Sequence, residues 1–360
     1  MKKLLAVLCS VFTSALFAAL VVDPSMSDNC VLLQNAENIV TGKTTAGLTV
    51  TVKLGGTQLG SATAGSDGAF TVAFNPGAAS FTARTVEVSD GSETKSFGNV
   101  LVGEVWLVSG QSNAQYWLGW KDFAGINQEW FADVDYPNCR MYTILKTDSD
   151  SGNPSGTLDP NRCWKVFNLE NSKYFSAIGF FFAKELYKGQ NVPVGIIVAA
   201  QGGSGINEWL TEETVKATGF TSGLAGTSRV EPDSRVRTRG VLWYQGETDG
   251  FTGQGQTYYQ NALPLLINQW REKQENPNYP VLLMSFPQSV SYDASEGRYP
   301  AIREAQKVNP SIFFFSSPGS APGWMKENGT MCGSRLRSDM YGTYADYIVK
   351  FIQAYAQEGI

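Results

Sequence analysis

Ser112 occupies the position where a catalytic serine is expected in an α/β protein. It follows an apolar, β-branched run at residues 104–109, and Asn113 comes directly after it. A serine between a strand and a helix projects its hydroxyl at the sheet edge, next to free helix N–H groups that stabilise a negative oxygen. Gly110 permits the tight bend that this corner needs. The pattern predicts a nucleophile, and the alternative is a Ser-Asn pair that only caps a helix.

Two further apolar runs also end in small or amide-bearing residues. The run at 194–200 leads into Gly202 and Gly203, a flexible corner able to present a backbone N–H. The run at 240–245 ends in Gln245, whose side-chain amide can donate to a developing negative oxygen. Each corner alone is compatible with ordinary turn chemistry. Together the three strand ends predict one shared pocket around Ser112.

The base that would activate Ser112 is missing from the sequence, because none of the 360 residues is a histidine. A serine hydroxyl is a poor nucleophile until a base removes its proton, and the pKa of histidine suits that task. The carboxylates nearest by motif are Glu247 and Asp249, and Glu208 lies on another loop. An unperturbed glutamate, with a pKa of about 4.3, is a weak base for a hydroxyl. We interpret Glu247 as a residue that holds its corner by hydrogen bonding, with a replacement base as the alternative.

The elements that must position these residues follow an alternating strand and helix pattern. Near-continuous apolar runs, typical of parallel strands covered on both faces, occur at residues 104–109, 194–200, 240–245, 281–286 and 312–317. Helical patterns lie at residues 176–189 and 257–274. The alternation predicts a three-layer α/β domain with its chemistry at the carboxyl ends of the strands. Residues 116–164 fit neither period, and we interpret them as a long insertion over that edge.

The preceding region has a different pattern. Residues 48–54, 69–74 and 84–90 alternate between apolar and polar side chains, and Gly, Asn, Asp and Pro punctuate the breaks. Short, regularly spaced strands with tight turns predict a small β-sandwich before the α/β domain.

Composition narrows the class of partner. Hydrophobic residues make up 42% and charged residues 17% of the chain, values that indicate a folded globular protein. The net charge of -5 provides no basic surface for nucleic acid or anionic lipid. A zinc site is not expected, since histidine is absent and no two cysteines form a C-x-x-C pair.

The first residues carry two lysines and then an apolar stretch to residue 22, which is typical of a secretory signal. We expect cleavage near Ala18 or Ala19 and therefore a secreted or extracytoplasmic protein. The alternative is an uncleaved anchor, and no later segment is apolar enough to span a membrane. Cleavage would leave four cysteines, which predict up to two disulfides in an exported chain: Cys30, Cys139, Cys163 and Cys332.

Several stretches resemble one family. The sequences GEVWLVSGQSN, VPVGIIVAAQGGSGINEW, VLWYQGETD and AIREAQ are similar to the sialate O-acetylesterase family of carbohydrate esterases, within the SGNH hydrolases. Residues 31–52 and 68–74 resemble the β-sandwich that precedes the catalytic domain in that family. We therefore expect a signal peptide at 1–19, an Ig-like β-sandwich at 24–102, and an SGNH-hydrolase-like domain at 103–360 with a flavodoxin-like α/β/α fold.

The resemblance also implies a chemistry. Ser112 is the nucleophile, and its own N–H, that of Gly203 and the amide of Gln245 form the oxyanion hole, with Glu247 beside them. The reaction implied is removal of O-acetyl groups from sialic acid or a related acylated sugar through an acyl-enzyme, without metal or organic cofactor. The oligomeric state stays open.

The chain departs from the family in its last block. The family carries an Asp-x-x-His-Pro element before a terminal helix. In this chain we expect that helix at residues 339–355. In that register the histidine falls near Ser334 and the aspartate near Met331, and neither residue type is right. Two functions therefore stay open: an exported carbohydrate O-acetylesterase with doubtful turnover, or a catalytically impaired relative that binds acylated glycans.

Overall fold

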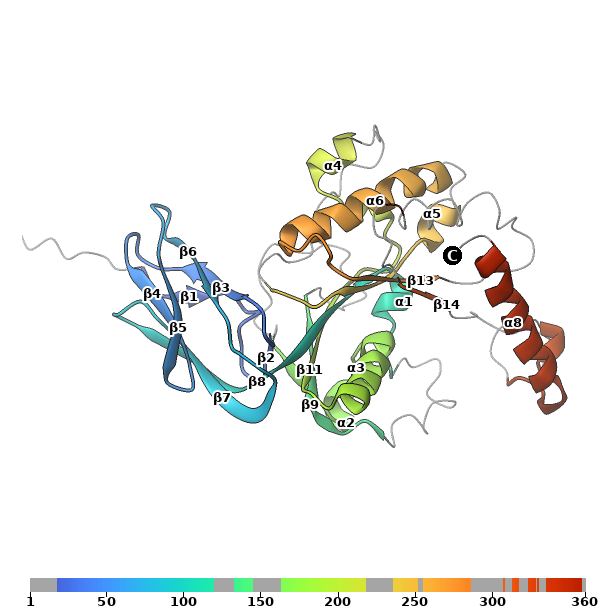
Figure 1. The fold of residues 1–360 in the computed structure, drawn as a ribbon, viewed down its shortest axis with the longest axis horizontal. Coiled ribbons are helices and arrows are strands. Elements are labelled where there is room, and N and C mark those ends of the chain that lie inside the picture. The colour runs from blue at the N-terminus through green and yellow to red at the C-terminus, as the bar shows by residue number, and fades with distance from the viewer. Residues whose placement is uncertain are drawn as a thin grey trace, which may run out of the picture.

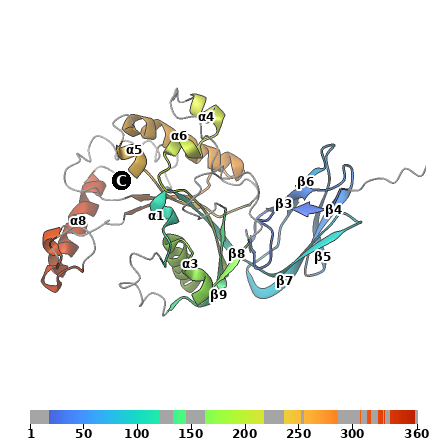
Figure 2. The same cartoon turned by 180° about the vertical axis from the view of Figure 1, so that it is seen from behind.

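Two regions share one long strand. The computed structural model describes residues 18–119, 133–144, 163–217, 236–251, 255–285, 307, 313–316, 323–327, 329 and 335–357. Strand β8 (Thr94–Gly110) begins in a β-rich region and ends in the centre of a second sheet. Figures 1 and 2 show this strand as the connection between the two parts of the molecule.

The β-rich region contains the strands that the alternating pattern predicts. They are β1 (Val21–Val22), β2 (Val31–Leu33), β3 (Asn38–Lys43), β4 (Thr49–Leu54), β5 (Thr57–Thr63), β6 (Ala69–Phe74) and β7 (Ser80–Ser89). β1, β3 and β6 form one sheet, and β4 pairs with β5 and β7 in another that continues into β8 and β2. Alternate side chains point inward, so Val50, Val52 and Leu54 of β4 are buried in the shared core.

The sheet of the α/β region has the order β10-β9-β11-β8-β12-β13-β14. The further strands are β9 (Tyr136–Thr143), β10 (Lys165–Phe167), β11 (Val194–Ala200), β12 (Val241–Tyr244), β13 (Val281–Ser285) and β14 (Phe313–Ser316). Neighbouring strands from β9 to β14 pair in parallel, and β10 is antiparallel to β9. All five predicted apolar runs contain strands of this sheet.

Helices lie on both faces of this sheet (Figure 1). Phe180 of α3 (Ala177–Gln190) shares a core cluster with Val108 of β8, while Leu266 of α6 (Gly255–Lys273) shares the other with Leu107. The shorter helices are α1 (Ser112–Gln115), α2 (Leu169–Ser172), α4 (Glu212–Ala217) and α5 (Glu247–Phe251). The structure is thus a mixed α/β fold, and the finer three-layer, flavodoxin-like class stays a prediction because the described helices are few.

The C-terminal helix α8 (Tyr341–Gln357) stands apart from the sheet in both views (Figures 1 and 2). Tyr341 and Val349 of this helix are 59% and 49% exposed. Among the described helices, none is long and apolar enough to cross a membrane. Of the predicted signal segment, residues 1–17 lie outside the described residues.

Buried polar contacts join the two regions. The guanidinium of Arg140 in β9 is 2% exposed and donates to the backbone carbonyls of Asn29 and Asn99. Glu104 accepts two hydrogen bonds from Arg239 at 2.9 and 3.0 Å. Because charged hydrogen bonds of buried groups are costly to break, they hold β8 and its neighbours in a fixed relation.

Two expectations need correction. Residues 116–164, interpreted as an insertion, contain β9, a strand inside the sheet; Pro137, Asn138 and Arg140 interrupt its apolar pattern. The predicted disulfides are also not seen, because Cys30, Cys139 and Cys163 are free, and Cys332 lies outside the described residues. Cys30 and Cys139 are buried as small apolar side chains, which is a common role for free cysteine.

Candidate active site

Three strands end in register at the carboxyl edge of the sheet. Gly110 of β8 is paired with Ala200 of β11 on one side and Tyr244 of β12 on the other. The residue that follows each strand is a glutamine, and the Gln111 N–H donates to the Tyr244 carbonyl at 3.0 Å. The three predicted corners therefore start at the same level of the sheet.

Gly110 is required by this geometry. Its φ is +136°, in the region that favours glycine, and an added Cβ would lie 2.0 Å from the Tyr244 carbonyl oxygen. The absence of a side chain lets β8 and β12 approach where the chain turns into α1.

Ser112 and the glycine corner are neighbours. Ser112 is exposed, and a Cβ built on Gly202 would lie 3.7 Å from the Cβ of Ser112. The Gly202 N–H donates to the Gln115 side-chain oxygen at 2.8 Å. Gly203 is exposed with a φ of +75°, and its N–H has no acceptor among the described residues. Gly203 thus carries an exposed backbone N–H one residue after Gly202, the neighbour of Ser112.

The buried side chain of Gln245 connects the three corners. Its amide nitrogen lies 3.1 Å from the Gln111 side-chain oxygen, 3.0 Å from the Ser204 carbonyl oxygen and 2.5 Å from the Asp249 carboxylate. The Gln111 oxygen also accepts from the N–H groups of Gly246 and Thr248. The Gln245 side-chain oxygen is buried and has no donor within the described part of the chain.

Asp249 is the buried carboxylate of the site. It is 8% exposed, and the oxygen that accepts from Gln245 also accepts from the Ile206 N–H at 3.0 Å. Burial raises the pKa of Asp249 above its usual value, and the hydrogen bonds from Gln245 and Ile206 oppose that shift.

Glu247 contacts the residue after the serine. Its carboxylate accepts a hydrogen bond from the Asn113 side-chain amide, and its second oxygen is buried without a donor among the described residues. No described side chain accepts a hydrogen bond from the Ser112 hydroxyl, so neither Glu247 nor Asp249 is in place as its base.

All four predicted site residues therefore meet at one edge of the sheet: Ser112, Gly203, Gln245 and Glu247. The contacts of Gln245 to Gln111 and Asp249 were not predicted. The glutamine that follows each of the three strands was the signal in the sequence, since an amide can both donate and accept between neighbouring strand ends.

Aromatic residues that follow the corners differ in accessibility. Trp209 is 1% exposed, packs edge-on to Trp243, and donates to the Ser204 hydroxyl at 3.1 Å. It therefore belongs to the core. Trp117 is half-buried and packs against Tyr174, which is 58% exposed.

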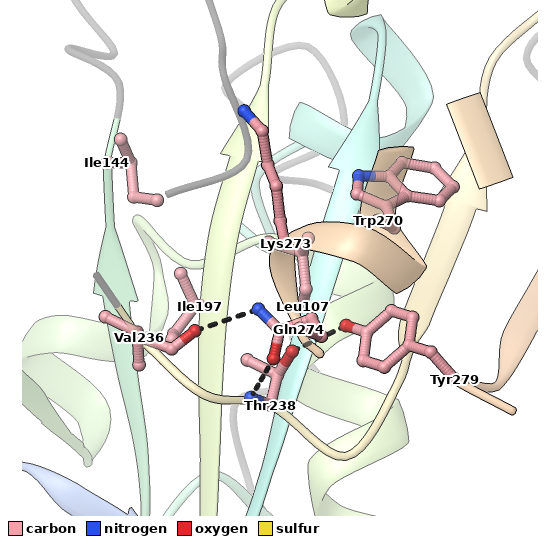
Figure 3. A pocket seen from close by; sticks show the side chains of 9 residues that line it. All are labelled: Leu107, Ile144, Ile197, Val236, Thr238, Trp270, Lys273, Gln274 and Tyr279. Carbon is pink, nitrogen blue, oxygen red and sulfur yellow. Dashed lines mark hydrogen bonds between the residues drawn. The ribbon is translucent and has the colours of Figure 1, made fainter. Parts of the chain in front are cut away.

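A cavity lies toward the opposite ends of the strands and shares no residue with the corners (Figure 3). Leu107, Ile197 and Trp270 supply part of its wall. Some of the polar atoms there are paired with each other: the Thr238 N–H donates to Gln274, and the Thr238 and Tyr279 hydroxyls are 2.5 Å apart. This cavity is a packing gap, with no chemistry assigned to it.

Fold and site together define a mixed α/β protein with a serine exposed at a strand-to-helix corner. A backbone N–H without an acceptor in the described part of the chain lies at the next corner. The chain belongs to the family of sialic acid-specific acetylesterases, which are carbohydrate esterases: residues 102–317, more than half of the chain, match the sequence profile of that family. Residues 24–102 match the profile of a bacterial Ig domain.

Individual relatives agree with this assignment. The chain is 26% identical over 238 residues to the sialate O-acetylesterase of Pongo abelii and, over the same length, to that of Homo sapiens. Each match covers 59% of this chain and 45% of the relative, so the chain spans less than half the length of these relatives. A solved carbohydrate acetylesterase from Xanthomonas citri has a TM-score of 0.66 at 23% identity, covering 83% of this chain and 68% of that one.

The C-terminal segment has a different similarity. Residues 285–360 match the profile of the glycosyl hydrolase family 30 TIM-barrel domain, which overlaps the esterase match only up to residue 317. A putative glucosylceramidase of Caenorhabditis elegans is 45% identical to the chain over 67 residues, which are 18% of this chain and 13% of the relative. The segment where the esterase pattern predicts a histidine thus lies in a region that is similar to another family.

Proposed function

We propose that this protein is an exported carbohydrate O-acetylesterase-type protein that acts on O-acetylated sialic acid or a related acylated sugar, with slow turnover. Ser112 is the nucleophile, and the oxyanion forms against the N–H groups of Ser112 and Gly203 and the amide of Gln245. The observation that carries the proposal is the pairing of Gly110 with Ala200 and Tyr244, which brings the three corners together. In this proposal the catalytic region, residues 103–360, has the three-layer flavodoxin-like arrangement, follows an Ig-like domain at 24–102, and needs no cofactor.

Slow turnover follows from the missing base. Hydrogen-bond donors that stabilise an oxyanion still lower the barrier when the serine is not activated, since they act on the charge that develops in the transition state. Loss of the catalytic histidine costs about 10⁶ in kcat in a serine protease. We attribute the absence of the histidine block to the C-terminal segment, whose similarity from residue 285 onward is to a glycosidase.

The test of this function is hydrolysis of an acetyl ester together with labelling by a fluorophosphonate probe. We expect slow labelling of the wild-type protein and none of Ser112→Ala. Ser66→Ala, at an exposed serine in a turn of the β-rich region, is the matched control and should label like wild type. Labelling of Ser112→Ala at the wild-type rate would remove Ser112 from the site.

A second function is favoured by one observation: the Ser112 hydroxyl has no proton acceptor among the described residues, and the chain has no histidine. In that case the protein binds acylated glycans without cleaving them. Titration calorimetry with an O-acetylated sialoside and its deacetylated form separates the two functions. Binding that requires the acetyl group, without hydrolysis or labelling, would establish the binding function.

A further inference from the structure

Gln245 depends on its surroundings for its orientation. A glutamine side chain has three rotatable bonds, and an oxyanion donor must be held within about 0.5 Å of its working position. The amide nitrogen of Gln245 lies within hydrogen-bond distance of three acceptors, one more than its two hydrogens can serve at once: Gln111, Ser204 and Asp249. In the proposed function one hydrogen turns to the oxyanion while Asp249 keeps the other. A flipped amide would place its oxygen against those three oxygens, so only the observed orientation is stable.

Among these acceptors, Asp249 is the charge-bearing group and the one that reaches a second corner. Its Oδ2 accepts from Gln245 Nε2 at 2.5 Å and from the Ile206 N–H at 3.0 Å. Hydrogen bonds to a carboxylate are about twice as strong as those between neutral groups. The Asp249 Oδ2 atom therefore fixes both the side-chain amide of Gln245 and the backbone at Ile206, which follows the glycine corner.

The glycine corner is anchored on both sides of Ser204. The Ser204 N–H donates to the Gln201 carbonyl at 3.3 Å, and the Ser204 carbonyl accepts from Gln245 at 3.0 Å. A Cβ on Gly205 would lie 3.3 Å from Asp249 Oδ1, so the backbone there packs directly against the carboxylate. The direction of the Gly203 N–H is thus coupled to Asp249 through three consecutive residues.

We propose that Asp249 is the positioning residue of this site: it holds the Gln245 amide and the glycine corner in the geometry that Ser112 requires. This role rests on the proposed function, and Asp249 does not touch substrate in it. Because a single oxygen makes both contacts, an uncharged acceptor in the same place should keep them, although each is weaker than with a carboxylate. The Asp249→Asn variant keeps one side-chain oxygen for that position, whereas Asp249→Ala removes it.

The experiment compares Asp249→Ala and Asp249→Asn with wild type. We expect Asp249→Ala to lower kcat for an acetyl ester at least tenfold with little change in KM, and Asp249→Asn to stay within threefold of wild type. For scale, loss of the donor itself in Gln245→Ala should cost about 10² to 10³ in kcat. Asp90→Ala is the control, since it removes another buried aspartate, in the β-rich region, and should keep the kcat of wild type.

A second readout does not need turnover. Amide hydrogen exchange by NMR should show a protected Ile206 N–H in wild type, Ser112→Ala and Asp249→Asn, and a loss of that protection in Asp249→Ala. If neither the wild type nor any variant hydrolyses the ester but the exchange pattern holds, the proposed function fails and the positioning role of Asp249 stands. Unchanged exchange and kcat in Asp249→Ala, or equal losses in both Asp249 variants, would overturn the proposal.

Discussion

The side-chain oxygen of Gln111 lies 3.1 Å from the side-chain nitrogen of Gln245. Gln111 directly precedes Ser112, and Gln245 directly follows β12, so this hydrogen bond joins the serine corner to the Gln245 corner. Both side chains are buried, at 3% and 7% exposure, and solvent does not compete for the contact. The alignment of the site therefore depends on a side chain that lies beneath it.

Gln111→Met tests this dependence. Methionine has a similar length but no oxygen acceptor, so the amide of Gln245 and the N–H groups of Gly246 and Thr248 lose a partner. We expect a loss of about 1–3 kcal/mol in the free energy of unfolding, the cost of leaving buried donors without acceptors. Urea denaturation measures it. Gln58→Met, at an exposed position in β5, is the control and should change stability by less than about 0.5 kcal/mol.

Gly110→Ala tests the close approach of β8 and β12. Its Cβ would lie 2.0 Å from the Tyr244 carbonyl oxygen, so the backbone of one strand must move. Gly91→Ala is the matched comparison, because Gly91 also has a positive φ, +86°, but open space around its Cβ. We expect Gly91→Ala to cost about 1–2 kcal/mol from backbone strain alone, and Gly110→Ala to lower the melting temperature much further. Equal melting temperatures would contradict the steric argument.

The sequence predicted the elements whose patterns are strong. Five apolar runs became parallel strands, and the alternating runs became the β-rich region, since side-chain period reports directly on burial. Convergence of Ser112, Gly203 and Gln245 also followed from the sequence. Parallel strands that neighbour one another end at one edge, so residues after their ends must meet.

Other features depend on contacts that local pattern does not report. β9 was missed because the buried Arg140 and the preceding Pro137 break its apolar pattern, and the guanidinium is stabilised by carbonyls from the other region. The disulfide expectation rested on a count of cysteines, whereas bonding requires two thiols in reach. The role of Asp249 was weighed as a base, and only the fold shows that its oxygen accepts from two corners.

The buried thiols give a further prediction. Burial raises the pKa of both Cys30 and Cys139 to about 12, so almost no thiolate is present at neutral pH. We expect both to react with DTNB slowly in the native protein and rapidly in urea, whereas the half-buried Cys163 reacts in the native state. Mass spectrometry of the labelled peptides assigns each site. Rapid native labelling of Cys30 or Cys139 would contradict their burial.

Asp249 makes stability depend on pH. Its folded-state pKa is raised above the unfolded value of about 3.9, so between these two values the folded state binds more protons than the unfolded state. Protonated Asp249 therefore contributes its full stability to the fold below the unfolded pKa. That contribution is lost as pH rises through the raised folded pKa, because the buried carboxylate is then charged. Asp249→Asn cannot ionise and avoids this loss. We expect the variant to gain stability over wild type in urea denaturation at pH 7, and the gain to shrink at pH 4. A gain that is larger at pH 4 would contradict the sign of the shift.

The last prediction concerns the segment with glycosidase similarity. Replacing residues 318–360 with the C-terminal part of the human sialate O-acetylesterase introduces a segment that, by the family pattern, carries a histidine. A catalytic histidine is worth about 10⁶ in kcat in a serine protease. We therefore expect a folded chimera to hydrolyse acetyl esters well above the wild-type rate. Addition of Ser112→Ala to the chimera should abolish the gain.

A point variant is the matched comparison. Ser334→His places a histidine where the family register would put it, but inside a segment that is similar to a glycosidase from residue 285 onward. If this segment does not occupy the place of the esterase block, the single histidine should leave hydrolysis unchanged. Circular dichroism and thermal unfolding confirm that each protein is folded before rates are compared. Recovery by Ser334→His equal to that of the chimera would show that the segment does occupy that place. A folded chimera without a gain would refute the segment as the cause of the proposed slow turnover.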